Sequence, residues 1–273
     1  MQSSKLAKKI RRIEITSNKL VDEIFSGEYR SGFRGKGIEF DNIRQYIPGD
    51  DVRNIDWNVT ARHNKTFVKQ FCEEREMNMF LLIDMSRSNS FGRKKELITE
   101  ISATLALSAN RNNDRVGVIF FTETVEKMIP SKNGKKHILS IIESILEFEP
   151  RQTGTSISNA LRYFSRIEKK RSVVFLISDF LDVGYEKELK ASSSRNDLIQ
   201  IRVIDRAEER VPAGAIFTFE DLETGETVVL DNMKRDLEIK PPDAGYRRNT
   251  VTIYTDEDYV KPLRQFFKRR GRA

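Results

Sequence analysis

The sequence predicts an α/β fold in which a mainly parallel sheet is covered by helices on both faces. Short apolar runs alternate along the chain with longer segments whose apolar residues recur every three or four positions. The short runs are apolar along their whole length, which is typical of strands buried on both faces of a sheet. This alternation favours strand–helix–strand units that bring parallel strands together.

The individual elements follow in order from Met77 onward. The predicted strands are Met79–Ile83, Arg115–Thr122, Val173–Ser178, Leu198–Ile204 and Thr250–Tyr254. The predicted helices are Lys94–Asn110, Lys135–Leu146, a short helix with Leu161 and Phe164, Tyr185–Ser193 and Tyr259–Lys268. Val125–Ile129 is expected to be an edge strand, and Ile216–Leu230 a hairpin outside the sheet that turns at Thr224–Gly225. Periodicity does not predict the order of the strands.

The first part of the chain follows a different pattern. It begins with an amphipathic helix that ends at Gly27, and its apolar face consists of Ile10, Ile13, Leu20, Val21 and Ile24. Glycines and a proline then punctuate brief strands at Ile38–Phe40 and Thr66–Phe71. We therefore expect an N-terminal segment over residues 1–75 and a larger domain over 76–273.

Composition excludes several classes of protein. Of the 273 residues, 38% are hydrophobic and 33% are charged, and no run approaches the roughly 20 apolar residues of a membrane-spanning helix. Met1–Arg12 has no apolar stretch of the kind found in a secretory signal. Cys72 is the one cysteine, and His63 and His137 are the two histidines, which excludes a disulfide framework and disfavours a zinc site. We expect a reducing, cytoplasmic setting.

The net charge of +7 comes largely from clusters at the two ends of the chain. The basic residues there are Lys5, Lys8, Lys9, Arg11, Arg12, Lys268, Arg269, Arg270 and Arg272. Such clusters can contact nucleic acid, anionic lipid or an acidic protein. No aromatic residues interleave with them to stack on bases, so no nucleic-acid partner is expected, whereas peripheral contact with a membrane stays open.

Oxygen-bearing side chains follow the predicted strands. Asp84, Ser86 and Ser88 come directly after one strand, and Asp179 follows another. The loop before the short helix supplies Thr155. Ligands of parallel sheets bind where the carboxyl ends of the strands meet their loops, and carboxylate and hydroxyl oxygens suit Mg²⁺ or Mn²⁺. The sequence therefore predicts a divalent-metal site at this edge of the sheet.

The alternation of Asp84, Ser86 and Ser88 has a physical use. In an extended chain, residues two apart point to the same side, so the three side chains can converge on one ion. Neutral hydroxyl ligands leave much of the charge of the ion uncompensated. The ion should then attract an incoming carboxylate, which favours a site that binds a partner over one that catalyses a reaction.

These residues resemble the metal-ion-dependent adhesion site of von Willebrand factor A domains. The resemblance implies that Asp84, Ser86, Ser88, Thr155 and Asp179 are the metal ligands, with Thr155 a better match than Thr153. The sequence departs from the pattern at Asn89, where many relatives have methionine. Because Asn89 supplies nothing that the site lacks, this departure does not count against metal binding.

A second resemblance extends from about Gly27 to Asp205. Gly35-Lys-Gly-Ile-Glu-Phe40, Arg44-Gln-Tyr-Ile-Pro-Gly-Asp-Asp-Val-Arg53, Ile55-Asp-Trp57 and Ala61-Arg62 are similar to the signature of the bacterial DUF58 family. The resemblance implies a Rossmann-like von Willebrand factor A domain after this segment, a Mg²⁺ site, and an association with MoxR-type AAA+ ATPases. It further implies an adaptor or co-chaperone for protein assembly or maturation, whose partner is the ATPase or its client.

Enzymatic readings fit the sequence less well. A phosphotransferase of the haloacid dehalogenase type needs an aspartate two positions after its nucleophile, where this chain has Ser86. Ser88 is not in a Gly-x-Ser-x-Gly elbow, and no Walker sequence follows Gly32–Gly37. Cys72 is expected to be a packed thiol. We expect a protein that is not an enzyme, and keep a Mg²⁺-dependent hydrolase and a nucleic-acid binder as alternatives.

The Gly35–Arg62 stretch has two interpretations. Its charged residues Asp50, Asp51, Arg53 and Asp56 lie among Tyr46, Pro48 and Trp57. They either form a surface that recognises a partner or form a structural corner, in which charge-assisted hydrogen bonds order a loop against the larger domain. The second is favoured because an irregular chain must satisfy many backbone groups through side chains. Trp57 is accordingly expected to anchor packing.

Overall fold

The chain forms two compact units in the computed structural model, one of residues 1–32 with 78–273 and one of residues 33–77. The residues described are 8, 10–18, 21, 39–63, 65–72, 77–90, 93–211, 215–220, 227–232, 237–238 and 249–271. The expected N-terminal segment, 1–75, therefore falls in both units. Each unit is described by itself.

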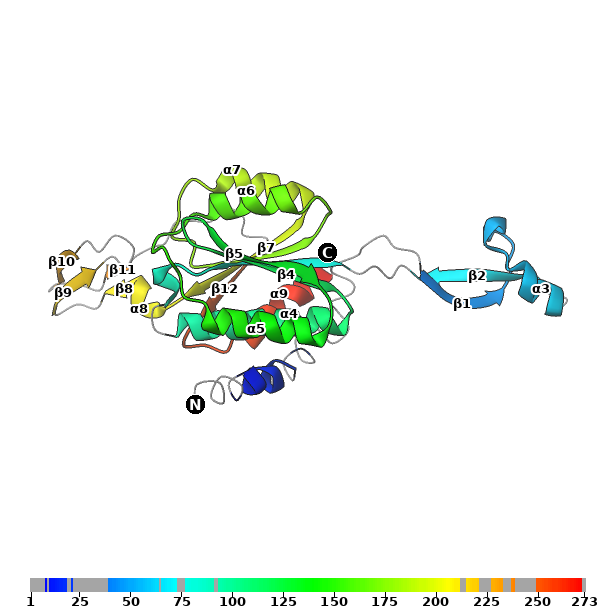
Figure 1. Cartoon of the computed structure of the whole chain (residues 1–273), viewed down its shortest axis with the longest axis horizontal. Helices are drawn as coiled ribbons and strands as arrows, with labels where there is room; N and C mark the ends of the chain where they lie inside the picture. Colours follow the sequence, from blue (N-terminus) through cyan, green and yellow to red (C-terminus); the bar gives the residue numbers. More distant parts are fainter. Residues whose placement is uncertain are drawn as a thin grey trace. The chain divides into compact units, whose positions relative to one another are not determined.

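The larger unit is built on a six-stranded sheet with the order β12-β7-β6-β3-β4-β5 (Figure 1). The strands are β3 (Asn78–Asp84), β4 (Arg115–Phe121), β5 (Val125–Lys132), β6 (Val173–Ser178), β7 (Asp197–Ile204) and β12 (Thr250–Tyr254). Neighbouring strands are parallel except β5, which pairs with β4 in the antiparallel sense at the sheet edge. The predicted α/β class, mainly parallel sheet and edge strand are confirmed.

Helices cover both faces of this sheet. They are α4 (Lys94–Arg111), α5 (Lys135–Glu147), α6 (Ile157–Ile167), α7 (Glu186–Arg195) and α9 (Val260–Gly271). Helices α6 and α7 lie on one face, and α4, α5 and α9 lie on the other (Figure 1). Both faces of β6 are therefore buried along its whole length, as its continuous apolar sequence predicts. No helix within the described ranges is both long and apolar enough to cross a lipid bilayer.

One close contact shows how tightly α6 packs on the sheet. Phe80 on β3 and Phe164 on α6 meet edge to face, with ring centroids 5.2 Å apart. Phe80 occupies the space beside Gly117 of β4, where an added Cβ would lie 2.5 Å from Phe80 Cε1. Glycine at this position therefore makes room for the aromatic pair.

The site predicted from sequence lies where the strand order reverses. Strands β4 and β5 lie on one side of β3 in the sheet, and the later strands β6, β7 and β12 lie on its other side. Central strand β3 thus has β4 and β6 as its two neighbours. Loops that leave the carboxyl ends of β3 and β6 diverge to opposite faces and open a place for a ligand between them.

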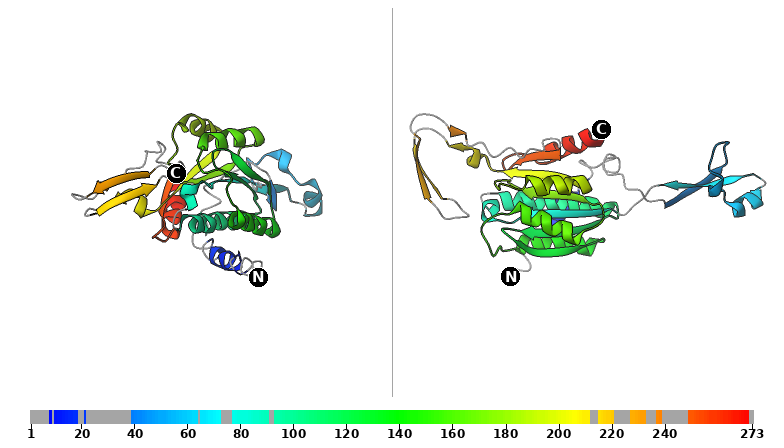
Figure 2. Two further views of the ribbon diagram at one scale, coloured as in Figure 1. Left: turned by 60° about the vertical axis from the view of Figure 1, so that its left-hand side comes forward. Right: turned by 90° about the horizontal axis from the view of Figure 1, so that it is seen from above.

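An excursion from the sheet separates β7 from β12. It consists of α8 (Arg206–Glu209), β8 (Arg210–Val211), β9 (Ala215–Glu220), β10 (Thr227–Asn232) and β11 (Leu237–Glu238). Strands β9 and β10 pair in the antiparallel sense, which confirms the predicted hairpin, while its predicted turn at Thr224–Gly225 lies outside the described residues (Figure 2). Strands β8 and β11 pair at the root of the excursion.

The start of the chain is helical over residues 10–18. Ile13 and Val21 are buried as predicted, and the carboxylate of Glu14 lies 2.6 Å from Lys135 Nζ on α5. Leu20, Ile24 and the predicted cap at Gly27 lie outside the described residues.

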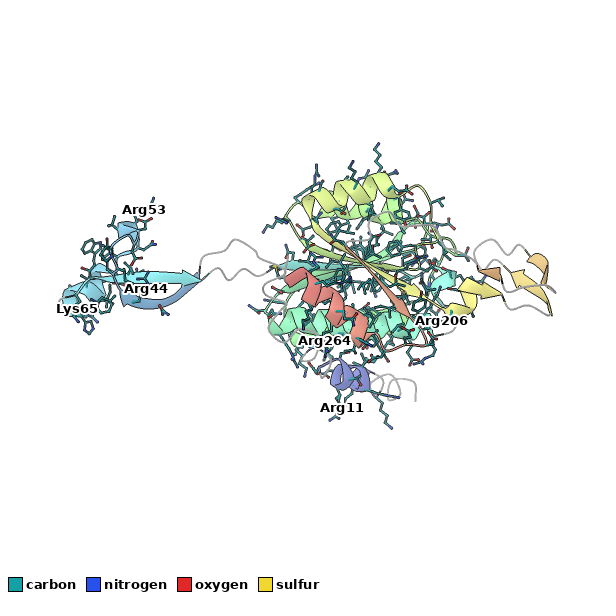
Figure 3. The ribbon with its side chains drawn as sticks, turned by 180° about the vertical axis from the view of Figure 1, so that it is seen from behind. Arg11, Arg44, Arg53, Lys65, Arg206 and Arg264 are labelled. Atoms are coloured by element: carbon teal, nitrogen blue, oxygen red, sulfur yellow. The ribbon has the colours of Figure 1, made fainter. Side chains whose placement is uncertain are left out.

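The smaller unit contains β1 (Glu39–Gln45), the 3₁₀ turn η1 (Val52–Asn54), helix α3 (Trp57–His63) and β2 (Phe67–Cys72). Arg44 donates two hydrogen bonds of 2.8 Å to Asp50, and Asp51 accepts bonds from the side chain and backbone of Arg53 (Figure 3). The bonds from Arg53 lower the pKa of Asp51 to about 2. These charge-assisted bonds order the corner within the smaller unit.

The prediction that Trp57 anchors packing is wrong, because 68% of its surface is exposed. It begins a seven-residue helix in which no residue is buried. A two-stranded hairpin and one short helix do not form layers that can enclose a large ring.

Replacement of Trp57 by alanine should change the free energy of unfolding by less than about 1 kcal/mol, as is usual for exposed positions. Chemical denaturation of the whole chain measures this effect. A loss of several kcal/mol would mean that the indole is buried in solution.

Candidate metal centre

Asp84 is the centre of the site. It is the last residue of β3 and has no exposed surface. Its Oδ1 accepts a 3.0 Å bond from the backbone N–H of Ser86 and a 3.5 Å bond from Thr155 Oγ1. Its Oδ2 accepts a 2.6 Å bond from Ser178 Oγ at the end of β6. One carboxylate thus joins the ends of two strands to the loop before α6.

The two serines that follow Asp84 bring their hydroxyls to within 3.1 Å of each other. The turn that does this is a 3₁₀ helix, η2 (Arg87–Ser90), rather than the extended chain that the alternating pattern suggests. The convergence of Ser86 and Ser88 is therefore as predicted, but its backbone cause is different. A tight turn moves Ser88 back toward Ser86, whereas an extended chain would carry it away from the sheet.

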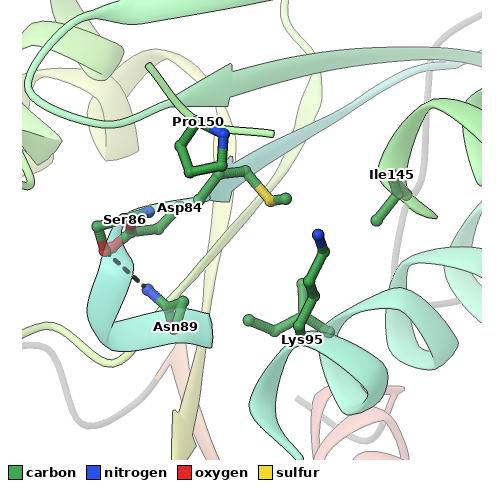
Figure 4. A pocket seen from close by; sticks show the side chains of 8 residues that line it. Asp84, Ser86, Asn89, Lys95, Ile145 and Pro150 are labelled. Carbon is green, nitrogen blue, oxygen red and sulfur yellow. Dashed lines mark hydrogen bonds between the residues drawn. The ribbon is translucent and has the colours of Figure 1, made fainter. Parts of the chain in front are cut away.

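Asn89 supports this turn and leaves one buried oxygen free. Its Nδ2 donates a 3.3 Å bond to Ser86 Oγ (Figure 4). Its Oδ1 is buried and has no hydrogen-bond partner among the described residues. A buried polar atom without a partner is costly, so this oxygen is a ready acceptor for a bound water or a hydrated ion.

Thr155 reaches the site through a loop that is bonded on both sides. The backbone N–H of Arg87 donates to the carbonyl of Thr153 at 3.1 Å, and that of Ser156 donates to the carbonyl of Thr122 at 2.8 Å. Ser156 also caps α6 by accepting a bond from the N–H of Asn159. This geometry places the hydroxyl of Thr155 on Asp84, in agreement with the choice of Thr155 over Thr153.

Asp179 follows β6 at a sharp bend. Phe180, the next residue, has φ of 59°, a left-handed conformation that is uncommon for a bulky residue, and its ring is fully buried. The backbone N–H of Leu181 donates to Asp179 Oδ1 at 3.3 Å. Arg202 Nε on β7 donates to the Asp179 carbonyl at 3.2 Å. The other carboxylate oxygen, Oδ2, accepts a 3.2 Å bond from Lys94 Nζ.

Lys94 is a member of the site that the sequence prediction missed. It is the first residue of α4 and has no exposed surface. Its Nζ lies 3.2 Å from Asp179 Oδ2 and 2.6 Å from Glu208 Oε2 on α8. One signal could have found it: Lys94 precedes Leu97, Ile98 and Ile101 by three, four and seven residues, so it lies on the apolar face of its helix.

Burial, together with the nearby charge of Asp179, raises the pKa of Asp84 from 3.8 to about 7, against the hydrogen bond from Ser178. A group whose pKa is higher in the folded than in the unfolded state binds more protons in the folded state between the two values. Folding stability then falls as the pH rises through that window. A divalent ion would reverse this penalty by compensating the carboxylate charge.

We therefore expect the pH dependence of the metal-free protein to change when Asp84 becomes asparagine, which is neutral throughout. Near pH 4 the two proteins should have similar stability, and near pH 8 the variant should be the more stable. Thermal unfolding in a chelator across this range measures the difference between them. A difference that is the same at both ends of the range would contradict a raised pKa.

The residues present fit a small, hard cation. Asp84 lies among the hydroxyls of Ser86, Ser88 and Thr155, all of them oxygen donors, and the charge of Asp179 is near enough to raise the pKa of Asp84. No group of three or more His, Cys, Asp or Glu residues gathers anywhere in the described part of the chain, so a zinc-type ligand set is not found there. A cavity of about 10 Å³, the size of one water, lies against Asp84, Ser86 and Asn89.

Residues of the alternative readings lie elsewhere or outside the described ranges. His137 is bonded at 2.8 Å to the carbonyl of Val116, near the amino end of β4 and therefore at the opposite edge of the sheet. His63 is exposed on α3 of the smaller unit. Gly32–Gly37 and the side chain of Cys72 lie outside the described residues. His137 is thus not placed beside Ser88, as a Ser-His-Asp arrangement would require.

The chain is similar to several known proteins. The uncharacterized protein Rv1480 of Mycobacterium tuberculosis is 26% identical over 288 aligned residues, which cover 98% of this chain and 91% of that protein. Solved structures with a similar fold include BatB from Bacteroides thetaiotaomicron, with 14% identity, a TM-score of 0.47, and coverage of 72% of this chain and 100% of that one.

Another solved structure is that of proximal thread matrix protein 1 of the mussel byssus, with a zinc-occupied MIDAS motif. It has 15% identity and a TM-score of 0.42, and the match covers 72% of this chain and 47% of that one. Both are von Willebrand factor A-like. The sequence profile of DUF58, a family of proteins of unknown function, matches residues 42–245. Since this match spans well over half of its length, the chain belongs to the DUF58 family.

Proposed function

We propose that this protein is a metal-dependent protein-binding module whose ion holds a carboxylate of another protein. The observation that carries the proposal is the buried carboxylate of Asp84, which joins the serine turn, the Thr155 loop and the end of β6. Asp84 and Asp179 neutralise a divalent ion, and the hydroxyls add no further charge. Mg²⁺ usually keeps several water ligands, and a carboxylate from outside can replace one of them.

The rim of the site favours a protein as the ligand. Leu181 and Val183, in the loop that follows Asp179, are 51% and 76% exposed. Large apolar side chains are rarely this exposed in the described part of the chain, and these two lie within four residues of a site aspartate. Apolar residues beside a charged centre offer packing to a polypeptide, whereas a small inorganic ion would not use them.

The partner that we propose is a MoxR-type AAA+ ATPase or its client, with this chain as an adaptor or co-chaperone in protein assembly or maturation. The DUF58 signature supports this choice. The single cysteine supports a reducing, cytoplasmic setting. In this proposal the chain binds and is not an enzyme.

Capture of partners from the native host tests the proposal. Wild-type protein should retain an AAA+ ATPase or its client in Mg²⁺ and release it in a chelator, and Asp84→Ala should retain neither. A matched control, Ser140→Ala, removes an exposed hydroxyl on α5 that donates to the carbonyl of His137, and it should capture as the wild type does. Equal capture by wild type and Asp84→Ala, with and without Mg²⁺, would overturn the proposal.

The same preparations separate the two alternatives. A hydrolase would turn over a phosphoester with a requirement for both Mg²⁺ and Asp179. A nucleic-acid binder would lose affinity steeply with salt and on trimming of both termini. Part of the C-terminal basic cluster already has a structural role, since Arg270 on α9 pairs with Asp197 of β7 at 2.5 Å.

A further inference from the structure

Lys94 is an ammonium enclosed within the protein. None of its surface is exposed, and only 3% of the side chain of Asp179 is exposed. Burial of a charged amine is strongly unfavourable unless opposite charges compensate it. Asp179 and Glu208, at 3.2 and 2.6 Å from its Nζ, provide that compensation from two different elements.

The helix makes this position still less favourable for a cation. Lys94 is at the amino end of α4, where the helix dipole repels positive charge. The buried face of the helix continues through Leu97 and Ile98, so the side chain points into the protein instead of reaching solvent. Both the helix dipole and burial disfavour the charged lysine, so the carboxylates of Asp179 and Glu208 must stabilise it there.

The ammonium and a divalent ion require the same carboxylate. Asp179 Oδ1 already accepts the N–H of Leu181, and Oδ2 faces Lys94. An ion bound by Asp84 and the serine hydroxyls would draw on Asp179 for its second negative charge. It would also lie near the positive charge of Lys94, so the two cations compete.

We propose that Lys94 is a positioning residue that acts as an internal counter-cation: it holds Asp179 when no ion is bound, and thereby weakens the binding of the ion. This inference rests on the proposed metal site and concerns its regulation. The carboxylate of the partner then supplies negative charge that the site lacks. The ion consequently binds more tightly when the partner is bound, and the partner binds more tightly when the ion is bound.

Glu208 sets the strength of this competition. It draws Lys94 away from Asp179, because the shorter of the two ion pairs is with Glu208. It lies on α8, directly before β8, and Figure 3 marks its neighbour Arg206, which pairs with Asp256 and Glu257 in the loop after β12. When an ion takes Asp179, Lys94 is left to Glu208, so occupancy of the metal site is linked to the root of the excursion.

A double-mutant cycle of Mg²⁺ affinity, measured by titration calorimetry, tests this role. Lys94→Met should bind Mg²⁺ about 10-fold more tightly. Glu208→Gln should bind it about 10-fold more weakly, the lower end of the 10- to 100-fold range for residues that support metal ligands. Glu208→Gln should have less than about a two-fold effect once Lys94 is methionine, because Glu208 acts through the lysine.

Additive shifts would overturn the inference, because they indicate two independent long-range charges. If Lys94→Met does not fold, the affinity of Glu208→Gln alone provides the test. This variant should fold, because the side chain of Glu208 is 27% exposed and Asp179 still pairs with Lys94. Unchanged affinity in that variant would then overturn it. A wild type that binds no Mg²⁺ at all would instead refute the proposed metal site itself, and this inference with it.

Discussion

Replacement of Asp84 by alanine should abolish Mg²⁺ binding, with at least a 100-fold loss of affinity. The change removes one of two carboxylates and the acceptor shared by Ser86, Thr155 and Ser178. Loss of a directly bound carboxylate exceeds the 10- to 100-fold effect of residues that only support metal ligands. Titration calorimetry on the metal-free chain measures the affinity, and circular dichroism establishes that the variant is folded.

Glu188→Ala is the matched control, because it also deletes one paired carboxylate. Glu188 on α7, which is not one of the proposed ligands, accepts bonds of 2.9 and 2.6 Å from Arg162 on α6. Its loss should leave Mg²⁺ affinity unchanged. Equal effects of the two substitutions would mean that Asp84 is not a ligand.

Replacement of Phe164 by alanine should cost about 3–5 kcal/mol of unfolding free energy, the usual range for a buried aromatic residue. Phe164 has no exposed surface and packs edge to face on Phe80 of β3. Helix α6 begins directly after the Thr155 loop, so the fraction that stays folded should also bind Mg²⁺ less tightly. Urea denaturation followed by circular dichroism measures the stability.

Ile167→Ala, three residues further along the same helix, provides the comparison. Ile167 is 37% exposed, so its truncation should cost less than about 1 kcal/mol. Similar losses at the two positions would contradict the packing of α6 on the sheet through Phe164.

Hydrophobic pattern predicted the elements of the large unit well. Periodicity indicates which faces of an element are buried. The apolar run of β6 is buried on both faces, and the periodic isoleucines of α5 form the buried face of that helix. The order β12-β7-β6-β3-β4-β5 could not be predicted, because it depends on which buried faces meet. Exposure of Trp57 was missed for the same reason: an aromatic residue is buried only where other elements cover it.

The candidate site could be predicted from the sequence only where its residues form a local pattern. Asp84, Ser86 and Ser88 lie in one motif, and Asp179 follows a recognisable strand. Ser178 and Lys94 were not predicted because their contacts are distant in sequence. Ser178 bonds to Asp84, which lies 94 positions earlier in the chain. Lys94 bonds to Asp179, which lies 85 positions later. The sequence pattern of Ser178 indicates only the end of a strand. That of Lys94 indicates an ordinary helical lysine, unless its position on the apolar face of the helix is taken into account.

The position of the ion itself tests the central claim most directly. In a crystal grown or soaked with Mn²⁺, anomalous scattering should give one strong peak per chain at the strand ends, about 2.1–2.2 Å from the hydroxyl oxygens of Ser86 and Ser88, as hard octahedral cations require. At least one coordination position should face solvent, open to a carboxylate from another protein. Absence of a peak at saturating Mn²⁺, or a peak enclosed on all sides by protein ligands, would contradict a site that holds a partner through its metal.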